Sequence, residues 1–265
     1  MLTGKRIWII GGGSGIGREL ALKLGQSGNR VVISGRGLDS LTAVSGQFQH
    51  ANTGHDGSIA PLVFDVTEYQ GSTEIASKAA ELLGGIDILV FCAGRCEYID
   101  NAELSVDLFR RVYDVNVFGI VNALASALPL MKQSNSAEKP QIVGIASLST
   151  VVGLPRAEAY GSSKAAMIYL LDSLRLDLDK FGIDVTVVNP GFVETPMTAS
   201  NDFPMPFIMQ AGDAADCIIK GVAKRKRTVN FPWQLWLSLK LGAWLPSLWY
   251  RVIGPRLARR ESVGS

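Results

Sequence analysis

The sequence predicts an α/β fold built on a doubly wound, parallel β-sheet. Short apolar runs alternate with longer segments in which apolar residues recur every three to four positions, and a glycine-rich turn joins the first run to the first such segment. The alternation implies parallel pairing, because each crossover helix returns the chain to the same edge of the sheet.

The strands are expected at residues 5–10, 30–34, 60–64, 86–91, 141–146 and 184–188. Helices are expected from Ile16 to Leu24 and over residues 75–83, 106–131 and 158–181. The polar, glycine-containing segment 46–58 is predicted to be a loop, and its two histidines, His50 and His55, to be solvated.

Composition indicates a globular protein kept inside the cell. The chain has 265 residues, of which 47% are apolar, enough for a sizeable core. Its three cysteines, Cys92, Cys96 and Cys217, favour neither a disulfide framework nor a zinc site, and we expect no metal. The first apolar run is too short for a secretory signal, so a cytoplasmic location is expected.

Positive charge is concentrated toward the C-terminus. The net charge is only +2, yet residues 217–260 contain ten Lys and Arg and no Asp or Glu, which leaves −8 on the rest of the chain. A basic contact surface, if the protein has one, is therefore expected in this part.

The glycine-rich turn, GGGSGIG at residues 11–17, lies between the first strand and the first helix. In this context such a turn is typical of the Rossmann fold, where glycines allow a tight turn and close approach of the backbone to a pyrophosphate, and the N–H groups of the helix N-terminus face the phosphates. The expected cofactor contacts in this segment are Gly11, Gly13, Ser14, Gly15, Ile16 and Gly17.

The end of the second strand favours NADP over NAD. A carboxylate normally accepts the ribose 2′-hydroxyl of NAD there, but this sequence reads Ser34, Gly35, Arg36. Arg36, with Arg18 just after the glycines, offers guanidinium groups suited to a 2′-phosphate. The alternative is that either arginine is simply solvated.

Tyr160 and Lys164 form the candidate catalytic pair. They are four residues apart on a predicted helix and so lie on one face, about 6 Å apart along the axis. A neighbouring ammonium group is expected to lower the tyrosine pKa, and a tyrosine so tuned can give or take a proton. The pattern is short, and alone it is equally compatible with two unrelated surface side chains.

Together these features resemble the short-chain dehydrogenase/reductase family over residues 5–195. The glycine spacing Gly-x-x-x-Gly-x-Gly is followed by further matching positions, namely Asp65-Val66, Ala93-Gly94, Asn116, Ser147, the Tyr160-x-x-x-Lys164 pair, Pro190-Gly191, Val193 and Thr195. Ile10 and the Phe91-Cys92 pair depart from the family's usual threonine and Asn-Asn, which affects the bracing of those turns.

The resemblance implies a catalytic set of Asn116, Ser147, Tyr160 and Lys164. Tyr160 would donate a proton to the substrate oxygen while hydride moves from NADPH to the carbonyl carbon, with Ser147 hydrogen-bonded to that oxygen. Lys164 would bind the nicotinamide ribose and Asn116 a water molecule, and Asn116, Tyr160 and Lys164 are all expected to contact the cofactor. It further implies that the adenine end contacts Asp65 and Val66, and that Ala93, Gly94, Pro190, Gly191, Val193 and Thr195 contact the cofactor.

We divide the chain into a catalytic domain, residues 1–223, and a C-terminal extension, residues 224–265. Within the domain, residues 192–213 are rich in Met, Phe and Pro and are expected to cover an apolar substrate, although ordinary loop packing is an alternative. Thr195 could instead cap a short helix starting at Pro196, or serve both roles.

The extension is basic, Trp-rich and amphipathic. Trp233, Trp236, Leu237, Lys240, Leu241, Trp244, Leu245 and Leu248 follow helical spacing on one side. Pro232 and Pro246 bracket a helix of about 13 residues, short of the ~20 that span a bilayer. We expect residues 228–253 to contact the inner face of a membrane peripherally, ahead of an oligomer contact or a lid. Nucleic-acid binding is not expected, because the basic run adjoins an apolar helix.

The favoured function is an NADP-dependent oxidoreductase that interconverts a carbonyl and a secondary alcohol on an apolar, lipid-like substrate, with reduction as the expected direction. The alternative is a catalytically idle NADP-binding sensor or a membrane-surface scaffold of the same fold. The resemblance also implies a homodimer or homotetramer.

Overall fold

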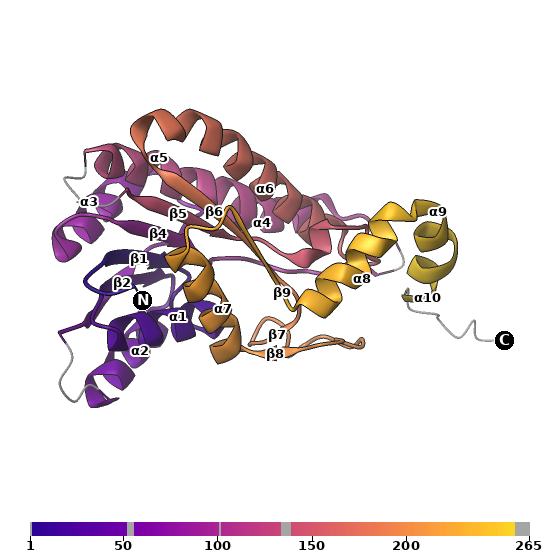
Figure 1. Ribbon diagram of the computed structural model, residues 1–265, viewed down its shortest axis with the longest axis horizontal. Helices are drawn as coiled ribbons and strands as arrows, with labels where there is room; N and C mark the ends of the chain where they lie inside the picture. The colour runs from indigo at the N-terminus through magenta and orange to yellow at the C-terminus, as the bar shows by residue number, and fades with distance from the viewer. Residues whose placement is uncertain (1, 52–55, 101, 134–138, 258–265) are drawn as a thin grey trace.

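The computed structural model describes residues 2–51, 56–100, 102–133 and 139–257, and the statements below refer to these (Figure 1). Seven strands form one parallel sheet in the order β3-β2-β1-β4-β5-β6-β9. They are β1 (Arg6–Ile10), β2 (Arg30–Gly35), β3 (Ser58–Val63), β4 (Ile88–Phe91), β5 (Gln141–Ile145), β6 (Asp184–Pro190) and β9 (Thr228–Phe231). The predicted doubly wound sheet is confirmed.

Strand β1 lies at the point where the winding of the sheet reverses. The chain runs from β1 outward to β2 and β3, then crosses back to pair β4 with the other side of β1. In sheets of this kind a crevice opens outside the carboxyl ends of the strands on either side of the reversal. The glycine turn, which follows β1 directly, therefore lies at the mouth of that crevice.

Helices cover both faces of the sheet (Figure 1). One layer contains α1 (Gly15–Gln26), α2 (Leu38–Ala51) and α7 (Ala211–Ala223). The other contains α3 (Ser72–Leu83), α4 (Val106–Tyr113), α5 (Gly119–Lys132) and α6 (Glu158–Leu178). Both faces of the sheet are thus buried, which explains why its strands are continuous apolar runs.

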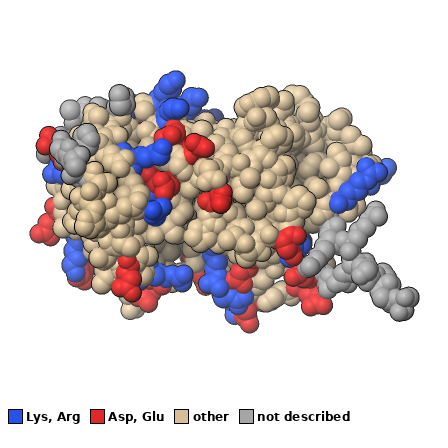
Figure 2. All heavy atoms as spheres, turned by 90° about the horizontal axis from the view of Figure 1, so that it is seen from below, with Lys and Arg blue, Asp and Glu red and all other residues tan. Residues whose placement is uncertain are grey.

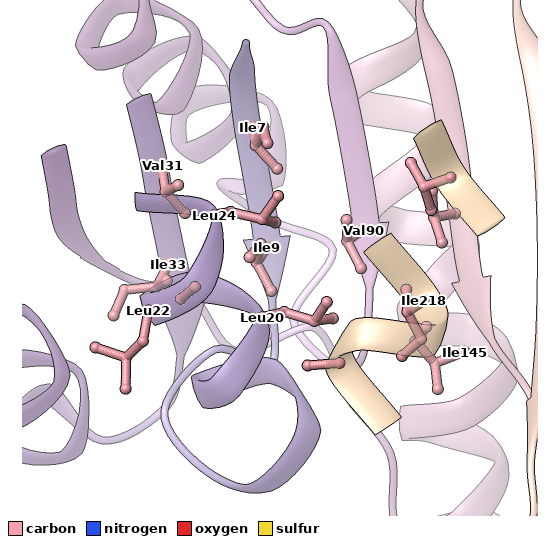
Figure 3. Packing of buried hydrophobic residues seen from close by; sticks show 14 of the residues in the cluster. Ile7, Ile9, Leu20, Leu22, Leu24, Val31, Ile33, Val90, Ile145 and Ile218 are labelled. Atoms are coloured by element: carbon pink, nitrogen blue, oxygen red, sulfur yellow. The ribbon is translucent and has the colours of Figure 1, made fainter. Parts of the chain in front are cut away.

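Side chains of β1 alternate between the two layers of the core. Ile7 and Ile9 pack with Leu20 and Leu24 of α1, as Figure 3 shows. Trp8 points to the opposite layer, where it is fully buried and its indole N–H donates to Ser34 Oγ at 2.9 Å. Because the indole N–H has a partner, this large side chain is accommodated inside the sheet without an unsatisfied polar group.

Three elements differ from the sequence-based expectation. The predicted loop over 46–58 is wrong at its start, because α2 continues to Ala51 and buries Val44 and Phe48 against the sheet. His50 is exposed at the end of α2, as expected, and His55 lies outside the described residues. Helix α7 and the edge strand β9 were not predicted.

The predicted helix over 106–131 is present but irregular. A π-helical segment, Asp114–Phe118, separates α4 from α5 without ending the helix. The continuous stretch Val106–Lys132 is long and apolar enough to cross a membrane by length and composition. Here it is a core helix, with Ile120, Leu124 and Met131 packed against the sheet.

The C-terminal extension folds back onto the catalytic domain. Helix α8 spans Trp233–Trp244, as the two prolines predicted, and is followed by α9 (Pro246–Leu248), a π-helical segment (Trp249–Ile253) and α10 (Gly254–Leu257). Residues 258–265 lie outside the described part. The inner face of this unit forms a third buried cluster with the domain, made of Leu148, Val152, Leu235, Leu239 and Trp249.

Candidate active site

A cavity of about 480 Å³ opens at the carboxyl ends of β1, β2, β4, β5 and β6. Most of the predicted site residues line it: Gly11, Gly13, Ser14, Gly15, Ile16, Arg36, Asp65, Val66, Ala93, Gly94, Ser147, Tyr160, Lys164, Pro190, Gly191, Val193 and Thr195. Gly17, Arg18 and Asn116 are not among the lining residues. The chain therefore brings the glycine turn and the catalytic pair into one space.

The glycine turn is packed too closely for side chains. Gly11 has φ +92°, and a Cβ there would lie 2.4 Å from the backbone nitrogen of Ala93. A Cβ on Gly17 would lie 2.0 Å from the carbonyl oxygen of Gly11. Gly17 thus lets α1 pass close under the turn, and its predicted contact with the cofactor stays a prediction.

The N-terminus of α1 faces the cavity. The helix begins at Gly15, and the side chain of Ser14, the N-cap residue, makes no capping hydrogen bond. The first-turn N–H groups at Gly15 and Ile16 lie at the cavity wall. A helix N-terminus that presents its N–H groups in this way suits an anionic group such as a pyrophosphate.

Only one of the two predicted phosphate-binding arginines is available to the cavity. Arg36, exposed just after β2, lines it together with Ser40. Arg18 instead pairs with Glu19 at 2.6 Å and donates to Gln47 Oε1 at 2.7 Å. Arg18 does not line the cavity in this arrangement, and its predicted contact with the cofactor stays a prediction.

Asp65 and Val66 form the wall beyond β3. The carboxylate of Asp65 accepts hydrogen bonds from the backbone N–H and the hydroxyl of Thr67, at 3.0 and 2.8 Å. Asn122 of α5 donates to the carbonyl oxygen of Val66 at 2.9 Å. These contacts hold the turn in one conformation at the end of the cavity next to β2.

Ser147, Tyr160 and Lys164 meet at the end of β5. Ser147 follows that strand, and its Oγ accepts a hydrogen bond from the N–H of Ser149 at 3.1 Å. Tyr160 and Lys164 lie on the first turns of α6. The ammonium nitrogen of Lys164 donates to the carbonyl oxygen of Ile145 at 2.8 Å and lies 5.9 Å from the centroid of the Tyr160 ring.

The pKa of Tyr160 does not shift in the direction expected from Lys164 alone. Burial raises the pKa of the phenol above its ordinary value and outweighs the lowering effect of a hydrogen bond with Ser147. Burial likewise lowers the pKa of Lys164 to about 8. The expectation of a lowered Tyr160 pKa is therefore corrected: both groups are withdrawn from water, which disfavours phenolate and ammonium alike.

Asn116 lies in the π-helical segment and is fully buried. Its Oδ1 accepts from the N–H of Arg95 at 2.8 Å, and its Nδ2 donates to the carbonyl oxygen of Arg95 and to Ser163 Oγ, both at 2.9 Å. The side chain thus ties the turn after β4 to α6. π-helical turns of this kind occur frequently at functional sites.

Gly94 separates Asn116 from Lys164. A Cβ at Gly94 would lie 3.4 Å from the ammonium nitrogen of Lys164 and 3.5 Å from Asn116 Oδ1. The glycine therefore keeps open the space between the two side chains. Asn116 borders this space although it does not line the main cavity, and its predicted contact with the cofactor stays a prediction.

Thr195 stands opposite the glycine turn. A Cβ on Gly15 would lie 3.0 Å from Thr195 Cγ2, so the loop after β6 closes over the N-terminus of α1. Residues 196–200 form turns rather than the alternative short helix, and Thr198 Oγ1 donates to the carbonyl oxygen of Val193 at 2.7 Å. The segment also contains β7 (Val193–Glu194) and β8 (Met209–Gln210), a small parallel pair.

An aromatic group borders the substrate end and was not predicted. Tyr98 and Phe203 are stacked edge to face with ring centroids 5.3 Å apart, and Phe192 lies 6.0 Å from Phe203. Met197 lines the cavity beside them. The members come from loops far apart in the sequence, so only the segment 192–213 carried a signal, through its Met, Phe and Pro content.

Arg156 joins the two loops that bear these aromatic rings. Its guanidinium group pairs with Asp100 at 2.9 Å and with Asp202 at 2.7 Å, and stands over the ring of Tyr98. Its own backbone has φ +65°, a conformation that non-glycine residues rarely adopt. We call this arrangement the Arg156 clasp; it holds the loop after β4 against residues 192–213.

Two cysteines lie close to the catalytic pair without a redox or metal partner among the described residues. Cys92 lines the cavity, and burial raises the pKa of its thiol to about 11. Burial also raises the pKa of Cys96. Both thiols are thus held in the protonated, less reactive form.

Residues 5–204 match a family model described as short chain dehydrogenase. The chain belongs to this family. An uncharacterized oxidoreductase of Myxococcus xanthus is 34% identical over 249 residues, 94% of this chain and 96% of that protein. An uncharacterized oxidoreductase of Staphylococcus aureus is 29% identical over 85% of this chain and 94% of its own length.

Solved structures of short-chain dehydrogenases/reductases have the same fold. A short-chain type dehydrogenase/reductase from Mycobacterium ulcerans is 25% identical, with a TM-score of 0.79 over 89% of this chain and 92% of that one. The Pseudomonas aeruginosa RhlG/NADP active-site complex is 26% identical, with a TM-score of 0.77 over 87% of this chain and 95% of that one. An actinorhodin polyketide ketoreductase variant with NADPH is 26% identical, with a TM-score of 0.75 over 87% of this chain and 97% of that one.

Proposed function

We propose that this oxidoreductase uses NADP to interconvert a carbonyl and a secondary alcohol on an apolar, lipid-like substrate, with reduction as the cellular direction. The observation that carries the proposal is the meeting of Ser147, Tyr160 and Lys164 in the same cavity as the glycine turn. A protonated phenol and a serine hydroxyl are the groups that an incoming hydride acceptor needs at its oxygen.

The residues of the cavity fit a nicotinamide dinucleotide. The absence of side chains at Gly11 and Gly94, together with the N-terminus of α1, suits the close approach of a pyrophosphate and a nicotinamide ring. When bound, the cofactor supplies or accepts the hydride. Asp65, Val66, Pro190 and Val193 would hold its two ends.

In the reductive direction, Tyr160 transfers its phenolic proton to the carbonyl oxygen of the substrate as that oxygen gains negative charge. Ser147 Oγ donates a hydrogen bond to the same oxygen and stabilises the developing charge. Lys164 binds the nicotinamide ribose and stabilises the phenolate that the transfer leaves behind. Its buried position strengthens that interaction, because charges attract more strongly in a medium of low dielectric constant.

Three observations support NADP as the cofactor. Arg36 follows β2 where an NAD-binding protein carries a carboxylate, and Ser40 lines the cavity beside it. The RhlG/NADP complex and the polyketide ketoreductase with NADPH share the fold over most of their length. A guanidinium group and a hydroxyl together suit a 2′-phosphate.

The apolar substrate is inferred from the aromatic group formed by Tyr98, Phe192 and Phe203, with Met197 beside it. Apolar side chains of this kind favour a ligand with a large apolar body and one polar reacting group.

The decisive assay is NADPH consumption with a panel of apolar ketones and aldehydes, with the Tyr160→Phe variant as control. Turnover by the wild type that the Tyr160→Phe variant lacks supports the proposed oxidoreductase activity. Binding of NADPH without turnover on any carbonyl or alcohol would favour the alternative, a catalytically idle NADP-binding sensor or membrane-surface scaffold.

We also propose that the protein is cytoplasmic and contacts a membrane peripherally through residues 228–253. The outer face of α8 leaves Trp233 66% and Trp244 77% exposed, with Leu237 and Leu241 exposed between them. Lys240 and Arg251 are the nearby exposed charges on this unit, and the end of the molecule that carries it has few charged side chains on the face in Figure 2. Tryptophan rings with flanking cations suit an anionic lipid surface.

Because the inner face of the extension is part of the core, deletion of the extension would disturb the active site. The membrane test therefore uses Trp233→Ser/Trp244→Ser, with Leu104→Ser, a similarly exposed apolar site in the segment before α4, as control. Sedimentation with vesicles that contain anionic phospholipid is expected to fall for the double variant alone. Equal sedimentation of all three proteins would rule out this contact.

Self-association is proposed through the outer faces of α5 and α6. Phe118, Val121, Tyr169 and Leu176 are exposed there. These apolar side chains suit a contact with a second copy of the chain, which would give a homodimer or homotetramer. Light scattering of the wild type and of Tyr169→Ser/Leu176→Ser tests this contact, since loss of it lowers the molar mass.

A further inference from the structure

The C-terminal extension holds the loop that joins Ser147 to Tyr160. The indole N–H of Trp249 donates to the carbonyl oxygen of Gly153 at 3.1 Å, and the N–H of Gly153 donates to the hydroxyl of Tyr250 at 3.3 Å. Two neighbouring side chains of one element thus satisfy both backbone groups of a single loop residue. Such an arrangement fixes the position of the backbone as well as burying apolar surface.

We infer that Trp249 and Tyr250 are positioning residues that set the relative placement of Ser147 and Tyr160. Both catalytic side chains are attached to the ends of the same irregular segment, with Gly153 near its middle. Any shift of this segment changes the distance between Ser147 Oγ and the phenol of Tyr160. The inference rests on the proposed function, because the two groups must reach the same substrate oxygen.

Close packing around Trp249 holds its indole in place against the loop. Its ring is 5% exposed and lies against Gly242 of α8, where a Cβ would approach it to 2.4 Å. Leu148, the residue directly after Ser147, belongs to the same buried cluster, as does Val152, the residue before Gly153. The loop is therefore held at several successive points by residues from beyond position 234.

The same extension also reaches the cofactor end of the cavity. A Cβ on Gly191 would lie 2.7 Å from Leu235 Cδ2, so α8 packs directly on the backbone that follows β6. Phe192, which is part of the aromatic group, is packed against the same buried cluster. The extension thus contacts the catalytic loop and the substrate loop together, whereas the glycine turn and Arg36 lie on other elements.

Because the extension contacts the catalytic and substrate loops but not the glycine turn or Arg36, a positioning role predicts a specific kinetic result. A small displacement of reacting groups lowers the rate of the chemical step strongly, with about a hundredfold loss for 1 Å. The affinity for NADPH depends mainly on the glycine turn, Arg36 and the β3 end of the cavity. It is therefore expected to stay unchanged when the contacts of Trp249 and Tyr250 are removed. A defect confined to turnover, with an increased kinetic isotope effect from deuterated NADPH, indicates misplaced catalytic groups rather than a loss of folded protein.

The test uses the full-length variants Trp249→Phe, Tyr250→Phe and their combination. Tyr250→Phe removes only the hydroxyl, whereas Trp249→Phe removes the indole N–H together with the five-membered part of the buried ring system. Tyr69→Phe, which removes a hydroxyl from an exposed tyrosine in the turn before α3, is the matched control. For each protein, kcat with an apolar ketone, the dissociation constant of NADPH and the isotope effect are measured per NADPH-binding site.

The double variant is expected to lose about tenfold in kcat, with NADPH affinity within twofold of the wild type and a larger isotope effect. Hydrogen exchange supplies a readout that needs no activity: amides of residues 148–160 are expected to exchange about fivefold faster, and those of 11–17 at the wild-type rate.

Unchanged exchange over 148–160, relative to Tyr69→Phe, would overturn the inference. Faster exchange with unchanged kcat would overturn it as well, because the loop would then move without consequence for the reaction. If the wild type consumes no NADPH with any carbonyl, the proposed function fails, and the exchange result alone decides whether the extension holds this loop.

Discussion

The ammonium nitrogen of Lys164 donates a hydrogen bond to the carbonyl oxygen of Ile145, the last residue of β5, at a distance of 2.8 Å. This contact fixes the lysine inside the domain, where burial lowers its pKa to about 8 from an ordinary value of 10.5. The charge of Lys164 is therefore sensitive to pH in a range where exposed lysines stay protonated.

Stability is expected to depend on pH through this residue. Below about pH 8 the folded and unfolded states both carry the proton. Between about pH 8 and 10.5 the unfolded state binds more protons, so this group makes the folded state more stable as pH rises, by about 1.4 kcal/mol per unit. Urea unfolding of wild type and Lys164→Met at pH 7.5 and 9.5 checks this. The gain in unfolding free energy between pH 7.5 and 9.5 should be smaller for Lys164→Met than for the wild type. It should persist for Lys224→Met, a control at an exposed lysine.

Tyr160→Phe is expected to lower kcat for ketone reduction by about 10² to 10⁴-fold, because the substrate oxygen loses its proton donor while the ring stays in place. Fluorescence titration should give an unchanged NADPH dissociation constant. Near-wild-type turnover with any good substrate would show that the proton comes from another group.

Arg36→Asp is expected to exchange the cofactor preference. A carboxylate at this position repels a 2′-phosphate and can accept the ribose 2′-hydroxyl, so kcat/KM for NADPH should fall about 100-fold while that for NADH rises. Arg18→Gln is the matched control, since Arg18 is paired with Glu19 and Gln47. An equal loss in both variants would contradict the assignment of Arg36.

Breaking the Arg156 clasp is expected to act on the substrate rather than on the cofactor. Asp202→Asn removes one ion pair and leaves the pairing of Arg156 with Asp100 and its stacking over Tyr98. Surface ion pairs contribute only about 0 to 1 kcal/mol, so a rise of two- to fivefold in KM for a bulky ketone is expected, at constant KM for NADPH. Asp107→Asn controls for the change of charge, because Asp107 and its partner Arg110, 3.9 Å away, are both exposed side chains of α4.

Two glycine-to-alanine changes should have opposite effects on stability. Gly17→Ala places a Cβ against the Gly11 carbonyl and is expected to cost about 3 kcal/mol. Gly46→Ala meets nothing within 4 Å inside helix α2 and is expected to gain about 1 kcal/mol. Thermal unfolding measures both, and a stable Gly17→Ala variant would show that the turn can relax.

Much of the sheet could be predicted because its strands are buried on both faces, which forces runs such as Ile7 to Ile10 to be wholly apolar. The edge strand β9 escaped prediction, since its Thr228–Phe231 segment is short and only partly buried. Helix α2 was missed although Leu41, Val44 and Phe48 follow a helical period, because Gly46 and the polar residues around it resemble a loop.

The proximity of Tyr160 and Lys164 could be predicted because helical spacing places the two side chains on one face whatever the rest of the fold does. Their burial could not, and burial reverses the direction of the tyrosine pKa shift. The Arg156 clasp depends on loops that carry no period, so nothing in the sequence linked Asp100 to Asp202. For Arg18, sequence shows where the guanidinium group is attached, but not that it turns toward Glu19 and Gln47.

The π-helical segment at Asn116 has a consequence for the rotational phase of its helix. Val112 and Ile120 are both fully buried, yet eight residues at about 100° each would set them about 80° apart around a regular α-helix. A π-turn absorbs one residue, which reduces the offset to about 20°. The helix thus has one residue more than the packing of its two ends requires. The extra residue forms a π-bulge at the point where Asn116 reaches the turn after β4. Deleting a residue there would leave both packed ends in phase and remove the bulge that carries Asn116.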